Sequence, residues 1–246
     1  MVGSLLLRGM LIGVVAGLLA FAFAHAFGEP QVNKSIAFEE QTAKAAGEAE
    51  EPEIVSRAVQ STLGLATGLV VFGAAVGGIF SLVFAFVYGR VGNLGCRATS
   101  ALLALAAFVS IVVVPQIKYP ANPPAVGSPD TIGSRTGLFF IMLVVSIAAM
   151  VAAIVLARRI WNDYGPWNAV MIAGAAFIVF IGAVDFLMPV VDEVPKNFSA
   201  DVLWRFRITS LGIHAILWTV IGLAFGAFAE RKLGEQPAAR MKPAYR

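Results

Sequence analysis

Six apolar stretches, each near the length of a bilayer crossing, constrain the fold of this sequence more than any other feature. A hydrocarbon core about 30 Å thick requires about 20 apolar residues in a helix. A segment within lipid must be helical, because nothing there can hydrogen-bond free backbone groups. Charged residues make up only 13% of the chain, against about 25% in a soluble domain. The sequence therefore predicts an all-α, polytopic membrane helix bundle, a single integral membrane domain over residues 1–246. The stretches lie near Leu5–Phe27, Leu63–Tyr88, Thr99–Pro115, Thr136–Ala157, Trp167–Met188 and Ile208–Ala229.

The first stretch has an alternative interpretation as a signal peptide. Ala24-His25-Ala26 has the small-residue pattern of a signal-peptidase site, and cleavage there would leave five transmembrane helices. Against cleavage, the apolar region begins before Arg8 and is long for a signal peptide. We therefore expect six transmembrane helices, with five as the alternative.

The distribution of basic residues predicts the orientation of these helices, since Lys and Arg concentrate in cytoplasmic loops. With the N-terminus inside, the inner loops hold ten basic residues against three acids, and the outer loops hold eight against eleven. Both termini are therefore expected to be cytoplasmic. This orientation gives an acidic outer loop at 28–57, expected as a solvated helix or loop, a Pro-rich outer loop at 116–134 and a basic cytoplasmic tail at 230–246.

Several function classes are excluded by what the sequence lacks. No basic cluster is interleaved with aromatic residues, so the sequence does not indicate nucleic-acid binding. The single cysteine, Cys96, excludes an internal disulfide framework and a CxxC site. No Gly-Lys-Ser/Thr pattern, nucleophile elbow or metalloprotease spacing is present. We therefore expect neither an enzyme nor a covalently bound cofactor.

Ionisable residues within transmembrane helices are rare, and each is by default a candidate functional residue. Asp185 lies four residues before Pro189, and His214 lies six residues into the last stretch. His25 is about one turn from the outer end of the first stretch. Imidazole and carboxylate at one depth suit a divalent first-row metal ion such as Co²⁺, Ni²⁺ or Zn²⁺. The candidate metal ligands are Asp185, His214, His25, Glu29 and Met188; alternatively, the two histidines serve only in packing or at the interface.

Asp185 is harder to explain without a function than either histidine. An unpaired carboxylate within a transmembrane helix costs a few kcal/mol, although less near the interface. Its side chain should therefore face a polar cavity or pair with a cation. The candidate cations for such a pair are Arg135, Arg205 and Arg207.

The Pro-rich outer loop is expected to be stiff. Proline lacks a backbone donor and disfavours helix in the preceding residue, so Pro115 should end the third helix. The prolines that follow should hold the chain extended, and a similar stop follows the fifth helix at Met188–Phe198. We expect the two loops to form a cap over an outer vestibule. Its polar and proline residues are Lys118, Asn122 and Pro123, with Arg135, Arg205 and Arg207 available for ion pairing.

Three segments resemble one known family. "FGEPQVNKSIAFEE", "VPQIKYPANPPAVGSPDTIGSRT" and "EVPKNFSADVLWRFRITSLG" are similar to the CbtA family of predicted cobalt transporter subunits, and the resemblance runs along nearly the whole chain. It implies a multi-pass protein of the bacterial inner membrane, linked to cobalt uptake for cobalamin synthesis. It also implies a partner, the small single-span subunit CbtB with its histidine-bearing tail. The resemblance brings no metal ligands with it.

Two functions follow as hypotheses. In the first, the chain is a transporter subunit that admits Co²⁺ or a related divalent ion from outside. A membrane potential of 100 mV supplies about 4.6 kcal/mol for an inward-moving +2 ion, so uptake need not involve ATP. In the second, the chain is a non-transporting membrane scaffold whose outer loops dock a partner or cofactor. In both, the lipid bilayer is a partner, and a homo-oligomer is compatible with either.

Overall fold

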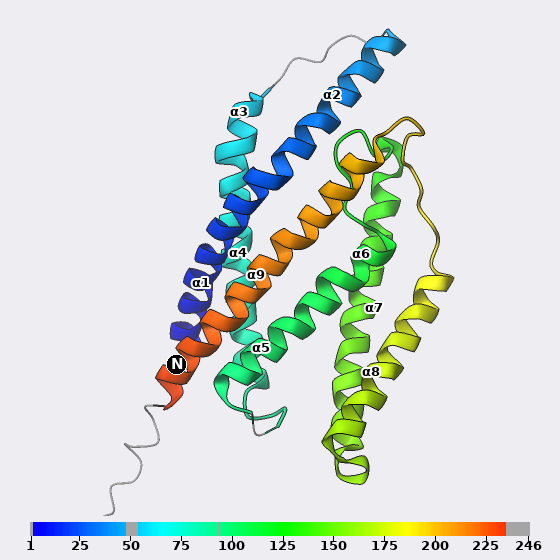
Figure 1. The fold of residues 1–246 in the computed structure, drawn as a ribbon. Coiled ribbons are helices and arrows are strands. Elements are labelled where there is room, and N and C mark those ends of the chain that lie inside the picture. Colours follow the sequence, from blue (N-terminus) through cyan, green and yellow to red (C-terminus); the bar gives the residue numbers. More distant parts are fainter. Residues whose placement is uncertain (1, 48–53, 93, 235–246) are drawn as a thin grey trace, which may run out of the picture. The chain divides into compact units, whose positions relative to one another are not determined.

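The computed structural model describes residues 2–47, 54–92 and 94–234 (Figure 1). Within these residues every regular element is a helix, and six helical segments are long and apolar enough to cross a membrane. This confirms the predicted fold class and the six spans. The acidic residues at 48–53 and the tail from 235 onwards lie outside the described residues. The segments are Gly3–Ala46, Arg57–Val87, Cys96–Lys118, Pro129–Arg159, Trp161–Leu187 and Ala200–Lys232.

The chain divides into two compact units. Unit 1 comprises Met1–Ala22, Arg57–Leu105 and Ile213–Arg246, and unit 2 comprises Phe23–Ser56 and Ala106–Gly212.

Two helices of unit 1 are in direct backbone contact. Helix α1 (Val2–Phe23) lies against α4 (Leu65–Val87), and their glycines face each other. A Cβ atom on Gly13 would lie 2.0 Å from the carbonyl oxygen of Gly73, and one on Gly9 would lie 2.3 Å from that of Gly77. The backbones therefore touch without intervening side chains, as small residues four apart allow.

The other side of α4 packs through aromatic rings against α9 (Ala200–Gly234). Phe84 and Phe225 are fully buried, with ring centroids 5.1 Å apart. Gly222 and Gly226 of α9 approach α5 (Cys96–Ala107), where the Ser100 hydroxyl donates to the Gly222 carbonyl at 2.6 Å. Glycines spaced four residues apart therefore lie on packed faces of three helices of unit 1, α1, α4 and α9. The pair Gly64 and Gly68 differs, because no neighbouring side chain or separate segment lies within 3.4 Å of either.

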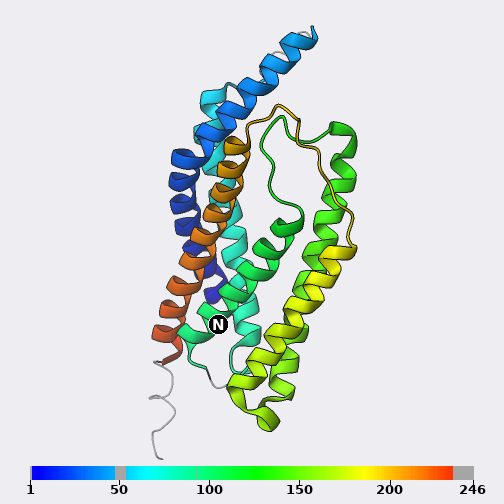
Figure 2. The same ribbon diagram turned by 45° about the vertical axis from the view of Figure 1, so that its right-hand side comes forward.

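Unit 2 is built around an antiparallel pair, α7 (Ile132–Arg159) and α8 (Trp161–Leu187), which run side by side in both views (Figure 2). Near its start α8 is broken at Gly165, whose φ is 76°, next to Pro166. On its other side α7 packs against a helix of the third span, where the Ser146 hydroxyl donates to the carbonyl of Ser110.

Three of the described spans contain a π-helical turn. In the second span, η2 (Gln60–Gly64) follows α3 (Arg57–Val59) and leads into α4. In the first and third spans, the turn lies where the sequence predicted the last residues of a helix. The first helix does not stop near Phe27: it continues through η1 (Ala24–Gly28) into α2 (Glu29–Ala46). The chain there is a helix, one of the two forms expected for the acidic stretch. It ends where Gly47 takes a left-handed conformation, φ 75°, as a C-cap.

The prediction that Pro115 ends the third helix is wrong. The helix passes through η3 (Phe108–Val113) into α6 (Val114–Lys118) and ends three residues after the proline. In a regular α-helix the proline ring would meet the carbonyl four residues earlier. A π turn immediately before it shifts the carbonyl ladder, which explains why the proline is tolerated. Buried Pro115 therefore lies inside the helix.

The α1–α4 contact yields a stability prediction. A Cβ atom on Gly73 would lie 2.3 Å from the carbonyl oxygen of Gly13, so Gly73→Ala must push the two backbones apart. We expect a loss of about 1–3 kcal/mol, the usual cost of overpacking. Thermal unfolding of the purified chain in detergent measures it.

Gly68→Ala is the matched control, since Gly68 lies on the same helix with nothing within 4 Å of its added Cβ. Equal unfolding temperatures for the two variants would show that the backbone contact contributes nothing.

Candidate functional site

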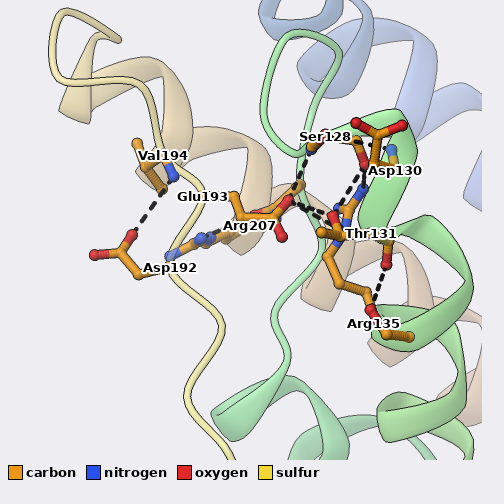
Figure 3. Close-up of polar contacts among 10 residues, drawn as sticks. Ser128, Asp130, Thr131, Arg135, Asp192, Glu193, Val194 and Arg207 are labelled. Carbon is orange, nitrogen blue, oxygen red and sulfur yellow. Dashed lines mark hydrogen bonds and ion pairs between the residues drawn. The ribbon is translucent and has the colours of Figure 1, made fainter.

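Two loops of unit 2 meet at one end of its helices. The first runs over residues 119–131, between α6 and α7, and includes the short 3₁₀ turn η4 (Pro129–Thr131). The second runs over residues 188–199, between α8 and α9. We call these two segments the loop pair. Their polar contacts converge on one side chain, Glu193, which reaches from the second loop toward the first (Figure 3).

Glu193 is the polar centre of the loop pair. Its Oε2 accepts from the backbone N–H of Ser128 at 2.7 Å and lies 2.9 Å from the Thr131 hydroxyl. Arg135 Nε forms an ion pair with the same oxygen at 3.3 Å. The hydrogen bonds from Ser128 and Thr131, and then the charge of Arg135, hold the pKa of Glu193 below its ordinary value against the opposing effect of burial.

Arg135 also ties the first loop to its own helix. Its Nη2 donates to the carbonyl of Ser128 at 2.9 Å, and its Nε lies 3.2 Å from the Thr131 hydroxyl. The guanidinium lies against Gly127, where a Cβ would come within 2.2 Å of Nη1. Gly127 has φ 114°, which also favours glycine. Glycine is thus required here by both contact and conformation.

Apolar side chains of both loops pack into a buried cluster. Val126, Phe198 and Val202 form a buried cluster, and the Phe38 ring of α2 meets Phe198 edge-on, with centroids 5.1 Å apart. The loops are therefore packed onto α2 and α9 within unit 2.

The first loop is less extended than its prolines predicted. Pro123 is buried, and its carbonyl accepts from the Val126 N–H at 3.3 Å, which closes a turn. Ala125 in that turn has a positive φ of 65°. The reason is that proline restricts only its own φ and the residue before it, so a turn can still form after Pro123.

The end of α8 carries a second polar cluster. Lys118 Nζ donates to the main-chain carbonyl of Asp185 at 2.6 Å, and the Tyr119 hydroxyl donates to that of Pro189 at 2.9 Å. Oδ1 of Asp185 is buried and has no hydrogen-bond partner among the described residues. Burial, and then the charge of Asp185, raise the pKa of Tyr119, as expected for a phenol close to a carboxylate.

The three arginines suggested as partners of Asp185 make other contacts. Arg135 pairs with Glu193, and Arg205 pairs with Asp201 one turn earlier on α9, at 2.8 Å. Arg207 donates to Oδ1 of Asn122 at 2.8 Å, which joins α9 to the first loop. Lys118, on the predicted cap, is the cation that reaches the Asp185 main chain.

The remaining candidate ligands fall in different parts of the chain. His25 is exposed on η1 in unit 2, and Glu29 begins α2. Met188 follows α8 and donates its N–H to the Val184 carbonyl at 2.9 Å. His214 belongs to unit 1, where its ring meets Phe72 edge-on at 6.4 Å. Within the described part of either unit, no three His, Cys, Asp or Glu side chains are grouped for a metal ion.

Sequence reasoning did not single out Glu193 or Gly127. The available signal for Glu193 was its place between Pro189 and Pro195, in a loop expected to face the basic Arg135. Gly127 follows a proline pair in a segment expected to be extended, which concealed its turn.

The six membrane-length helices of the described residues define a multi-pass helical membrane protein. Two of its connecting loops interlock in unit 2. The chain belongs to the CbtA family, described as "Probable cobalt transporter subunit (CbtA)", whose model matches residues 2–230. Comparisons with curated proteins and with solved structures gave no match.

The Glu193 contacts predict a pH dependence in the loop pair. Because the folded pKa is lowered, the contribution of these contacts is complete above the ordinary Glu value of about 4.3 and is lost as pH falls through the lowered value. Hydrogen exchange of the Ser128 amide, corrected for its intrinsic rate, should therefore stay constant from neutral pH to about 4.3 and rise only below it.

Glu193→Gln should speed exchange of the Ser128 amide severalfold at neutral pH and remove the acid step, because the charged acceptor is gone. Asp192→Asn is the matched control, since Asp192 precedes Glu193 in the same loop and interacts with the Val194 N–H at 3.5 Å and with the charge of Arg207. A step that survives in Glu193→Gln would assign the titration to another group.

Proposed function

We propose that this chain is the membrane subunit of a divalent metal transporter that takes up cobalt for cobalamin synthesis. The proposal places it in the bacterial inner membrane, with both termini cytoplasmic and a small single-span CbtB-like subunit as partner. It assigns no catalytic reaction to the chain. Support comes from membership of a family of probable cobalt transporter subunits and from a helical bundle of six membrane-length segments.

The single observation that carries the proposal to a site is the buried Oδ1 of Asp185, which has no hydrogen-bond partner among the described residues. A buried carboxylate oxygen without a donor is costly unless water or a cation compensates it. It lies near the end of α8, where main-chain carbonyl oxygens are also available. Oxygen ligands of this kind, with Met188 close by in sequence, can hold a divalent ion that keeps part of its water shell.

Few protein ligands suit a transporter. An ion that is conducted must bind well enough to enter and weakly enough to leave. A site centred on one carboxylate meets this requirement better than a closed set of four ligands, which holds a metal permanently. In this proposal His25 and Glu29, in the same unit as Asp185, are further ligands, and their contribution is tested by substitution. His214, in unit 1, stays a prediction from the sequence that is tested in the same way.

The scaffold function remains the second candidate, because no three-ligand metal group occurs within the described part of either unit. The interlocked loop pair would then serve as a rigid docking surface. Metal accumulation distinguishes the two functions.

The transport proposal predicts a strong effect at Asp185. Radioactive cobalt accumulation should fall at least tenfold in cells producing Asp185→Asn with the partner subunit, because the charged carboxylate at the centre of the proposed site is lost. His214→Ala should reduce uptake less. Protein abundance in the membrane is measured alongside.

Asp163→Asn is the matched control, an exposed acid near the other end of α8, and should leave uptake unchanged. Cells in which even the unaltered pair accumulates no cobalt would favour the scaffold. Full uptake by Asp185→Asn would remove this carboxylate from the pathway.

The orientation is tested separately by cysteine labelling in intact cells. Asp130→Cys, exposed in the loop pair, should react with a membrane-impermeant maleimide, whereas Asn162→Cys, exposed at the start of α8, should not. Cys96 is buried and is replaced by Ser in both variants. The reverse labelling pattern would place the termini outside.

A further inference from the structure

The end of α8 is a cluster of oxygen atoms that already attracts a cation of the chain itself. Two consecutive residues, Lys118 and Tyr119, donate to main-chain carbonyls on either side of this end, those of Asp185 and Pro189. The Val184 carbonyl is satisfied by the Met188 N–H. Oδ1 of Asp185 is left without a partner among the described residues.

Electrostatics explains why an ammonium group lies here. The last carbonyls of a helix have no intrahelical donors and carry partial negative charge, so cations are favoured at helix C-termini. Helix α8 ends at Leu187, and α6 ends at Lys118 itself. The Lys118 side chain thus starts at the end of α6, and its ammonium group lies at the C-terminal end of α8, on the carbonyl of a carboxylate-bearing residue.

The Lys118 contact is incomplete as a structural anchor. Its hydrogen bond goes to the carbonyl of Asp185, and no ion pair with the carboxylate is formed within 4.0 Å. A lysine placed only to neutralise Asp185 would be expected to pair with the carboxylate directly. The arrangement therefore leaves an oxygen available for a second cation.

We propose that Lys118 is a tethered cation that occupies the Asp185 end of α8 until a divalent metal ion displaces it. This inference rests on the proposed function and adds a competitor to its site. A divalent ion can bind the carboxylate and a main-chain carbonyl together, with twice the charge of an ammonium group. The lysine stem is long and flexible, so Nζ can leave while the backbone stays.

The return of Lys118 would also aid release. With the ion bound, the ammonium and the metal repel each other, which weakens the site compared with one lacking the lysine. When the ion leaves, Lys118 again satisfies the carbonyl. Such an exchange keeps the site from holding metal permanently, as conduction requires.

The first test uses the unaltered full chain. Acetylation of lysines by an N-hydroxysuccinimide ester is followed by peptide mass spectrometry, with and without Co²⁺, on purified protein in nanodiscs. Displacement should increase the acetylation rate of Lys118 severalfold, while the exposed Lys196 of the loop pair serves as internal control. In Asp185→Asn, Co²⁺ should have no effect on Lys118.

The second test measures competition. Lys118→Leu removes the charge at similar size and adds no metal ligand, so the half-saturating Co²⁺ concentration for binding should fall about tenfold, equivalent to about 1.4 kcal/mol. Lys118→Arg keeps the charge and should stay near the unaltered value. A purely structural lysine would instead lower the unfolding temperature in Lys118→Leu and leave half-saturation unchanged, which overturns the inference.

The two proposals fail in different ways. Cobalt uptake with unchanged half-saturation in Lys118→Leu would overturn the role of Lys118 and leave the transport function standing. Absence of cobalt uptake would reject that function, and the acetylation test is then repeated with Ni²⁺, Zn²⁺ and Mg²⁺. Faster Lys118 acetylation with any of these ions supports the displacement, and an unchanged rate with all of them overturns it.

Discussion

The scarcity of hydrogen-bond donors inside a bilayer is the constraint on which this structure depends. Each backbone carbonyl that leaves the regular helical pattern must find a donor within the protein. Buried hydroxyls provide one kind of answer: Ser100 donates to Gly222, and Ser146 donates to Ser110 at a π turn. Lys118 provides another at the end of α8. The same requirement that shapes the helices thus brings a charged group to the candidate site.

Outside the predicted spans, the polar groups of the loop pair also find their partners within the protein. Glu193 accepts hydrogen bonds from two donors of the first loop, and Arg135 forms an ion pair with its carboxylate. The apolar cluster around Phe198 then fixes both loops on helices of unit 2. Polar and apolar contacts therefore act together, and neither loop is a free connection. For a transporter subunit, this gives the region beside Asp185 a defined structure.

The spans could be predicted because hydrophobic length is a property of sequence alone. Their ends could not, since Pro115 and Gly28 are helix breakers only where the hydrogen-bond ladder is regular, and π turns precede or include them. Asp185 was identified by the cost of its charge in lipid. Its neighbour Lys118 and the hub at Glu193 are contacts across more than 60 residues, which spacing along the chain does not encode.

The glycine contact between α1 and α4 has a mechanical consequence. Backbone pressed against backbone contains no side-chain rotamers that could adjust, so the two helices must move as one stiff piece. Any conformational change of the chain has to be absorbed elsewhere. The π turns η1 and η3, whose ladders are already irregular, lie within a few residues of the borders between the units at Ala22 and Leu105. Because the α1–α4 contact cannot adjust, we expect the chain to bend at the π turns η1 and η3 instead.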